Sequence, residues 1–103
     1  MDIADGSITA KTVTLETPLI RGKSTIDTLT LRKPTAGELR GLRLQAIMES
    51  DVNSIIKLLP RVTQPALTET EAAMLDPADL LAMGNEILVF FLPKSVQADL
   101  EKL

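Results

Sequence analysis

The sequence predicts an α+β fold in which an N-terminal β-hairpin is followed by a small helical domain of three to four helices. Residues 12–17 and 24–32 alternate apolar side chains with threonine-rich polar positions, which is typical of half-buried strands. After Pro34 the apolar residues recur at helical spacing instead. A chain of 103 residues is one domain by length, so hairpin and helices should share one small core.

The hairpin is expected over residues 11–33, after a polar segment (residues 1–10) that lacks periodicity and should be frayed and disordered. Pro18 should end the first strand or place it at a sheet edge, because proline cannot donate a ladder hydrogen bond. The turn is expected at residues 21–23. An isolated two-stranded hairpin is marginal in water, so this one must pack on the helices, pair with another chain, or both.

The second strand is expected to pass directly into a helix at Pro34, which disfavours helical geometry at the residue before it. Thr35 and Glu38 have the spacing of a capping box, in which each side chain satisfies the other residue's backbone N–H. A helix is therefore expected over residues 36–49. Gly41 inside it would cost about 1 kcal/mol relative to alanine, which close approach by a neighbouring element would offset.

The next helix should begin at Ser50 or Asp51 as its cap. An apolar stripe then keeps the i, i+3, i+4, i+7 spacing as far as residue 59. Pro60 should end or kink this helix, because its ring clashes with the carbonyl four residues earlier. Residues 63–65 are expected to be a linker.

Two further helices carry clear start signals. Thr68 with Glu71 forms a second capping box, which opens a short helix. Asp76 caps the last helix, with Pro77 at its favoured first position and Asp79 facing the helix dipole. The helical part should end at residue 92, and residues 93–103 are expected to form an amphipathic C-terminal tail.

The last helix ends in six consecutive apolar residues (87–92), which cover every side of a helix. Leaving half of them in water would forgo several kcal/mol, at roughly 1.5–3 kcal/mol per large side chain. Either this helix is buried all round, or one side of it docks on another polypeptide. A strand is disfavoured because the upstream cap sets a helical phase.

Composition removes several classes of function. Cysteine and histidine are absent, so the chain has no thiolate or imidazole for a metal site or a nucleophile–base pair. Asp76 and Asp79 could be paired as catalytic carboxylates, but capping explains both. We therefore predict no catalytic, cofactor-binding or metal site and no enzyme.

The same composition bears on partners and location. The net charge of −3 disfavours nucleic acid, which is bound by basic surfaces. No segment approaches the ~20 apolar residues that span a bilayer, and the N-terminus lacks a signal-peptide pattern. We expect a soluble protein that stays where it is made. A basic cluster around Pro34 is better explained as a solvated face than as a patch for an acidic partner. It comprises Arg32, Lys33, Arg40 and Arg43.

The residues around Pro34 also carry a family resemblance. Leu-Arg-Lys-Pro-x-Ala-Gly-Glu-Leu-Arg-Gly-Leu (31–42) is preceded by Pro-Leu-Ile-Arg-Gly (18–22) and followed by Leu-Leu-Pro-Arg-Val-Thr (58–63). This series, continued through Leu-Asp-Pro-Ala-Asp-Leu (75–80) to Phe91, resembles the tail assembly chaperones of Mu-like contractile-tailed phages. The resemblance covers roughly residues 13–93.

The resemblance implies a small ATP-independent chaperone, acting in the bacterial host cytoplasm. Its client would be the aggregation-prone tape measure protein, which it coats until the tail tube polymerises around it. Members of the family are often accompanied by a longer product of translational frameshifting. The alternative is a structural or adaptor subunit that self-assembles as a homo-oligomer, which its presence in purified virions would reveal.

We expect the client-binding surface to combine one side of the last helix with the second face of the helix at 36–49. Both are apolar in excess of what a small core can enclose. The predicted client-binding residues are Leu44, Met48, Ile87, Leu88, Phe90 and Phe91.

Overall fold

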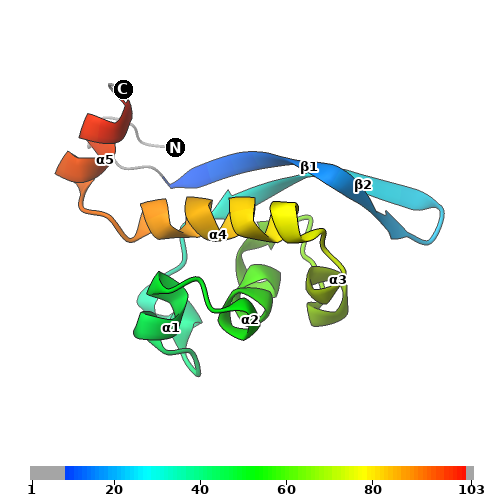
Figure 1. Cartoon of the computed structure of the whole chain (residues 1–103), viewed down its shortest axis with the longest axis horizontal. Coiled ribbons are helices and arrows are strands. Elements are labelled where there is room, and N and C mark those ends of the chain that lie inside the picture. Colours follow the sequence, from blue (N-terminus) through cyan, green and yellow to red (C-terminus); the bar gives the residue numbers. More distant parts are fainter. Residues whose placement is uncertain (1–8, 102–103) are drawn as a thin grey trace.

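The computed structural model describes residues 9–101 and confirms the α+β fold (Figure 1). Strands β1 (Ala10–Arg21) and β2 (Ser24–Arg32) form a long antiparallel hairpin along one side of the molecule. The remaining elements are the 3-10 helix η1 (Ala36–Leu39), α1 (Leu44–Met48), α2 (Val52–Val62), β3 (Thr63–Gln64), α3 (Glu69–Ala73), α4 (Pro77–Phe90) and α5 (Lys94–Glu101). Helix α4 runs along the hairpin, and α1, α2 and α3 lie on its other side (Figure 1).

The hairpin follows the prediction closely. Gly22 and Lys23 form its two-residue loop, and Gly22 has φ +59°, which glycine adopts without strain and which begins a type II′ hairpin turn. The first strand does not end at Pro18; it continues to Arg21 as an edge strand of the sheet, which was the second possibility for a strand proline. The pairing register shifts between Thr14 and Leu19, on either side of that proline.

The expected linker at residues 63–65 is wrong for its first two residues. Thr63 and Gln64 form β3, which pairs with Leu31 and Thr30 of β2 and makes the sheet three-stranded. The preceding helix α2 has the predicted cap, Asp51, but it does not end at Pro60 and continues to Val62. Its apolar stripe continues past the proline to Val62, and this burial keeps the last turn helical despite the lost hydrogen bond.

The single helix expected over residues 36–49 is also wrong. The chain forms the short η1, breaks, and then forms the short α1. Gly41 lies at the break with φ +82°, a left-handed conformation that glycine allows. A Cβ at this position would meet nothing within 4 Å, so the glycine serves the backbone turn and not a close approach.

The core is aliphatic and lies between the sheet and the helices. Inward-facing residues of β2 meet the buried stripes of α2 and α4 across it. Seven of its side chains have no exposed surface: Leu29, Leu31, Ile47, Leu58, Leu59, Met83 and Ile87. The expectation that the hairpin packs on the helices is therefore confirmed.

The two ends of the chain contain structure that was not predicted, and some of their residues lie outside the described part. Strand β1 already includes Ala10, and residues 1–8 of the segment expected to be disordered lie outside the described residues. The C-terminal tail contains a further helix, α5, whereas residues 35–92 hold four α-helices and η1, in agreement with the predicted three to four helices. Val96, an apolar residue of this tail, is exposed.

Two ion pairs join the hairpin to the helical part through the glutamates of the predicted capping boxes. Arg32 of β2 donates to both carboxylate oxygens of Glu38, and Glu38 Oε1 also accepts the Thr35 backbone N–H at 2.9 Å. Arg21 of β1 donates to both carboxylate oxygens of Glu71 at 2.8 and 2.6 Å. Each glutamate thus accepts a backbone N–H at a helix start and binds a strand. The Thr68 hydroxyl in turn accepts the Glu71 backbone N–H at 3.0 Å, whereas the Thr35 hydroxyl donates to the Glu38 carboxylate at 3.2 Å.

A third arginine completes the first of these connections. Arg61, in the last turn of α2, donates to the backbone carbonyls of Glu38 and Arg40 at 2.6 and 2.8 Å. Arg32 in turn donates to the Arg61 carbonyl at 2.7 Å. The irregular chain between β2 and α1 is therefore held to α2 by charged hydrogen bonds as well as by apolar contacts.

These ion pairs make stability depend on pH in the acidic range. The guanidinium of Arg32 lowers the pKa of Glu38 from 4.5 to about 2, assisted by the Thr35 N–H. Arg21 and the Thr68 N–H lower the pKa of Glu71 to about 2 in the same way. Because both pKa values fall on folding, the stabilisation is present above about pH 4.5 and is lost as pH falls from 4.5 towards 2.

We predict that the melting temperature of the wild-type protein falls between pH 5 and pH 2 more steeply than that of a Glu38→Gln, Glu71→Gln variant. Glutamine keeps the size of the side chain but not the charge that titrates. The variant should therefore have a lower melting temperature at pH 7, and its melting temperature should change less with pH. Thermal unfolding followed by circular dichroism measures both. Parallel pH profiles for the two proteins would show that these pairs add no pH-dependent stability.

A pair of glycine substitutions should have opposite effects. Gly84 lies inside α4, and a Cβ there would be 3.8 Å from Ser50 Oγ, an ordinary contact distance. We therefore expect Gly84→Ala to raise the free energy of unfolding by up to about 1 kcal/mol. Gly41→Ala should lower it by about 1–2 kcal/mol, because alanine is strained at positive φ. Urea unfolding measures both, and destabilisation by Gly84→Ala would contradict the open space seen at that position.

Candidate functional site

The outward face of α4 carries no charge. On the helical wheel one side of α4 faces the core and contains Met83, Ile87 and Phe90. The opposite side consists of small, apolar and amide side chains, fully or partly exposed: Ala78, Leu81, Ala82, Asn85, Leu88 and Val89. Leu81 is 60% exposed. A surface helix normally turns charged residues to solvent, so this face is unusual for a helix at the surface.

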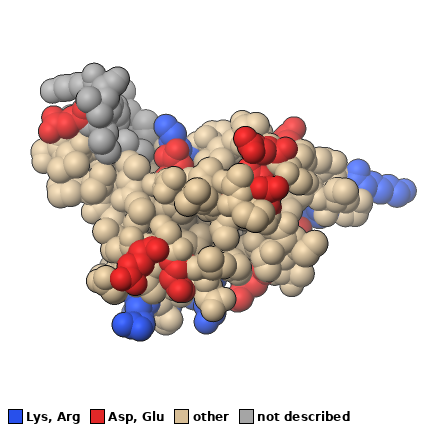
Figure 2. All heavy atoms as spheres, viewed as in Figure 1, with Lys and Arg blue, Asp and Glu red and all other residues tan. Residues whose placement is uncertain are grey.

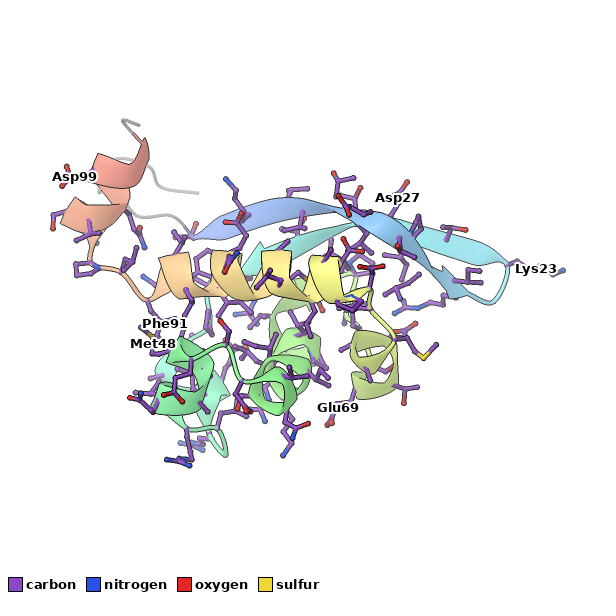
Figure 3. All side chains as sticks on the ribbon, in the orientation of Figure 1. Lys23, Asp27, Met48, Glu69, Phe91 and Asp99 are labelled. Atoms are coloured by element: carbon purple, nitrogen blue, oxygen red, sulfur yellow. The ribbon has the colours of Figure 1, made fainter. Side chains whose placement is uncertain are left out.

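Helix α1 extends this apolar surface on one side of α4. Leu44 and Met48, one helical turn apart, are 57% and 47% exposed. The turn that follows α1 lies against α4, because Ser50 approaches Gly84. Figure 3 shows Met48 and Phe91 projecting near each other between α1 and the C-terminal end of α4. We call Leu44, Met48, Leu81, Leu88 and Phe91 together the α1–α4 surface.

The structure divides the six predicted client-binding residues between surface and core. Leu44 and Met48 are exposed, Leu88 is half-buried, and Phe91 is half-buried and packs against the core. Ile87 and Phe90 are 0% and 4% exposed, so they are core residues and we remove them from the proposed surface. The apolar run is thus neither buried all round nor free along its whole length, since one side completes the core and the other stays accessible.

Leu81 is the residue that sequence reasoning missed. It lies two helical turns before Leu88, on the same side of α4. The sequence contained a signal for Leu81, because the cap at Asp76 fixes where the helix begins and the spacing of two turns then places Leu81 on the same side as Leu88. Four other exposed large apolar residues of the described chain lie outside α4 and α1: Ile20 at the hairpin tip, Val52 in α2, Met74 after α3 and Val96 in α5.

A buried carboxylate sets the position of α4 against the hairpin. Asp79 is 2% exposed, and its two oxygens accept the backbone N–H groups of Glu16 and Thr17 of β1 at 2.8 and 3.0 Å. Thr17 also donates its hydroxyl to Asp76, which caps α4 by accepting the Ala78 N–H at 2.8 Å. Both aspartates therefore serve the fold, as expected for Asp76, and Asp79 does so through β1 as well as through its place in the first turn.

The remaining polar features of residues 9–101 include a hollow beside α1. A hollow of about 350 Å³ lies between α1 and the start of α2, and its lining mixes acidic, basic and amide side chains, among them Arg43, Glu49 and Lys57. Within residues 9–101, no three His, Cys, Asp or Glu side chains come close enough to hold a metal ion. None of the helices in that part of the chain is both long and apolar enough to cross a membrane.

Comparison with known proteins places this geometry in a family. Residues 12–92 match the family described as phage tail assembly chaperone proteins, E, or 41 or 14. The chain belongs to this family. The tail assembly chaperone is 47% identical over 85 residues to tail assembly protein E of Escherichia phage P2, covering 82% of this chain and 93% of that protein.

A second relative is longer than the first. Over 95 residues the chaperone is 41% identical to tail assembly protein E' of Escherichia phage P2, covering 84% of this chain and 67% of that protein. No solved structure matches the chain. The family expected from the residues around Pro34 is confirmed, and the Mu-like attribution stays a prediction.

The role of Asp79 can be tested by a substitution that keeps its size. We expect Asp79→Asn to lower the free energy of unfolding by about 1–3 kcal/mol, because an amide can accept from only one of the two N–H groups and leaves the other unpaired. Chemical denaturation measures the change. Asp27→Asn, on an exposed carboxylate of β2, is the matched control and should have little effect. Equal stability of the two variants would contradict the role of the Asp79 carboxylate in holding α4 against β1.

Proposed function

We propose that this tail assembly chaperone binds the tape measure protein through the α1–α4 surface and keeps it soluble until the tail tube polymerises around it. It would act by binding alone, without ATP and without catalysis, in the cytoplasm of the bacterial host. The observation that supports this proposal is the uncharged outward face of α4, continued by the exposed Leu44 and Met48 of α1.

The physical argument concerns what such a surface does in water. Each large apolar side chain left exposed forgoes roughly 1.5–3 kcal/mol of burial, and a second polypeptide that covers it recovers part of this. A client with apolar segments is shielded from its own copies by the same contact. Shielding of this kind needs only mass action between surface and client, so no nucleotide has to be hydrolysed.

The lengths of the two phage P2 relatives support a second proposed partner, a longer form of this chain. The chain covers nearly all of protein E but about two-thirds of protein E', so sequence of this kind occurs in both a short and a longer protein. We propose that a longer form of this chain, made by translational frameshifting, accompanies it. Both forms would then present the same α1–α4 surface, and the longer one would add a further segment.

Co-expression with the tape measure protein tests the binding proposal. We expect the wild-type chaperone to keep the tape measure protein in the soluble fraction, and a Leu44→Asp, Met48→Asp variant to lose most of that effect. Both residues are exposed, so the variant should keep its fold and its melting temperature. The matched control is Ile20→Asp, which places the same charge on an 80% exposed residue at the hairpin tip.

Two results would contradict the proposal. One is a tape measure protein that stays insoluble beside the wild-type chaperone. The other is a folded Leu44→Asp, Met48→Asp variant that protects the client as well as the Ile20→Asp control does, which would place the contact elsewhere on the molecule.

A further inference from the structure

Along the sequence, the stretches that build the α1–α4 surface carry only acidic charges, and Arg43 and Lys57 at the ends of one stretch line the same hollow as Glu49 and Asp51. Between Arg61 and Lys94 the chain has five acidic residues and no lysine or arginine. Between Arg43 and Lys57 it has Glu49 and Asp51 and again no basic residue. These two stretches contain α4, α1 and the turn that joins α1 to α2, which are the elements that build the surface.

The acidic residues lie on both long sides of the α4 face. Glu86 follows Asp79 by two helical turns, so it lies along the side of α4 that faces β1. Glu49 and Asp51, both exposed, flank Ser50, the residue that approaches Gly84 on the opposite side. In Figure 2 uncharged surface occupies the middle of this face with acidic side chains around it, and the basic side chains project mainly at its margins.

The apolar residues between these acids form two rows. Leu81 and Leu88 form one row along α4, and Leu44 and Met48 form a second along α1. An amphipathic helix binds between two such rows by inserting residues at i, i+3, i+4 and i+7. Helix α4 has 14 residues, so it offers roughly 21 Å of length to a helical partner.

We propose that the segment held on the α1–α4 surface is an amphipathic helix whose apolar stripe is flanked by lysine or arginine. This deepens the proposed function and rests on it, because the segment would belong to the client. Glu86 would face basic residues on one flank of the helix, and Glu49 and Asp51 would face those on the other. The apolar rows supply the contact area and the carboxylates select the sign of the flanking charge.

The same charges disfavour the other occupants of this face. A second copy docked by two-fold symmetry would bring Glu49 and Glu86 close to the acidic residues of its partner, and like charges repel at an interface. Nucleic acid and anionic lipid are repelled for the same reason. A basic helix is the partner for which the apolar and electrostatic contributions agree.

Two synthetic peptides with one leucine stripe test the proposal by fluorescence anisotropy on the full chain. One has lysines beside the stripe and the other has glutamates at the same positions. At low salt we expect the lysine peptide to bind about tenfold or more tightly, and the difference to shrink as salt screens the charges. Glu49→Gln with Glu86→Gln should reduce the preference several-fold. Asp27→Asn with Glu69→Gln, which neutralises two carboxylates away from the surface in Figure 3, should leave it unchanged.

A second pair of variants tests the apolar rows. Leu81→Ser should abolish binding of the lysine peptide, whereas Met74→Ser, on a more exposed residue outside the surface, should not. Equal binding of the two peptides, or no binding of either, would overturn the proposal. So would a wild-type dimer that Leu81→Ser dissociates, because the face would then serve a second copy.

The outcomes separate this proposal from the proposed function. If the tape measure protein is kept soluble but the peptides show no charge preference, the function stands and the basic helix is wrong. If the lysine peptide is preferred and the tape measure protein stays insoluble, the surface has the inferred specificity but its client is a different protein.

Discussion

The packing of α4 against the hairpin decides which part of this chain is left for a partner. Asp79 accepts two backbone N–H groups from β1, which fixes both the position and the rotation of the helix. With that rotation set, Ile87 and Phe90 turn into the core and Leu81 and Leu88 turn outwards. A rotation of one residue, about 100°, would redistribute the apolar run between core and solvent, so the surface depends on this carboxylate without containing it.

The glutamates of the capping boxes have a related double role. A capping glutamate needs only the backbone at its own helix start, yet Glu38 and Glu71 each also bind an arginine from the hairpin. The three-residue spacing from Thr35 and Thr68 predicted the first role, because capping is a local arrangement. It contained no information on the second, because Arg21 lies 50 residues from Glu71 and only the fold brings the two together.

The same distinction separates what the sequence could predict from what it could not. The hairpin, both capping boxes and the start of α4 follow from alternation, turn residues and caps, all of which act within a few positions. The break at Gly41 and the strand β3 follow from tertiary contacts instead: Arg61 holds the chain beside Gly41, and β2 provides a partner for Thr63. The candidate surface was predicted in part. The apolar excess of residues 87–92 is visible in the sequence, but which of these residues face the core depends on Asp79 and β1.

In the proposed binding mode, the apolar surface and the carboxylates beside it act together. An apolar face alone would bind its own copies as readily as a client, which is a hazard for a protein that must remain dispersed. Carboxylates beside that face weaken self-association because identical copies repel, while a partner of opposite charge gains from the same groups. Two of the basic residues, Arg32 and Arg61, instead hold the chain between β2 and α1. In the proposed binding mode, Glu49, Asp51 and Glu86 would let a small aliphatic domain expose leucines on a helix and still favour a basic client over its own copies.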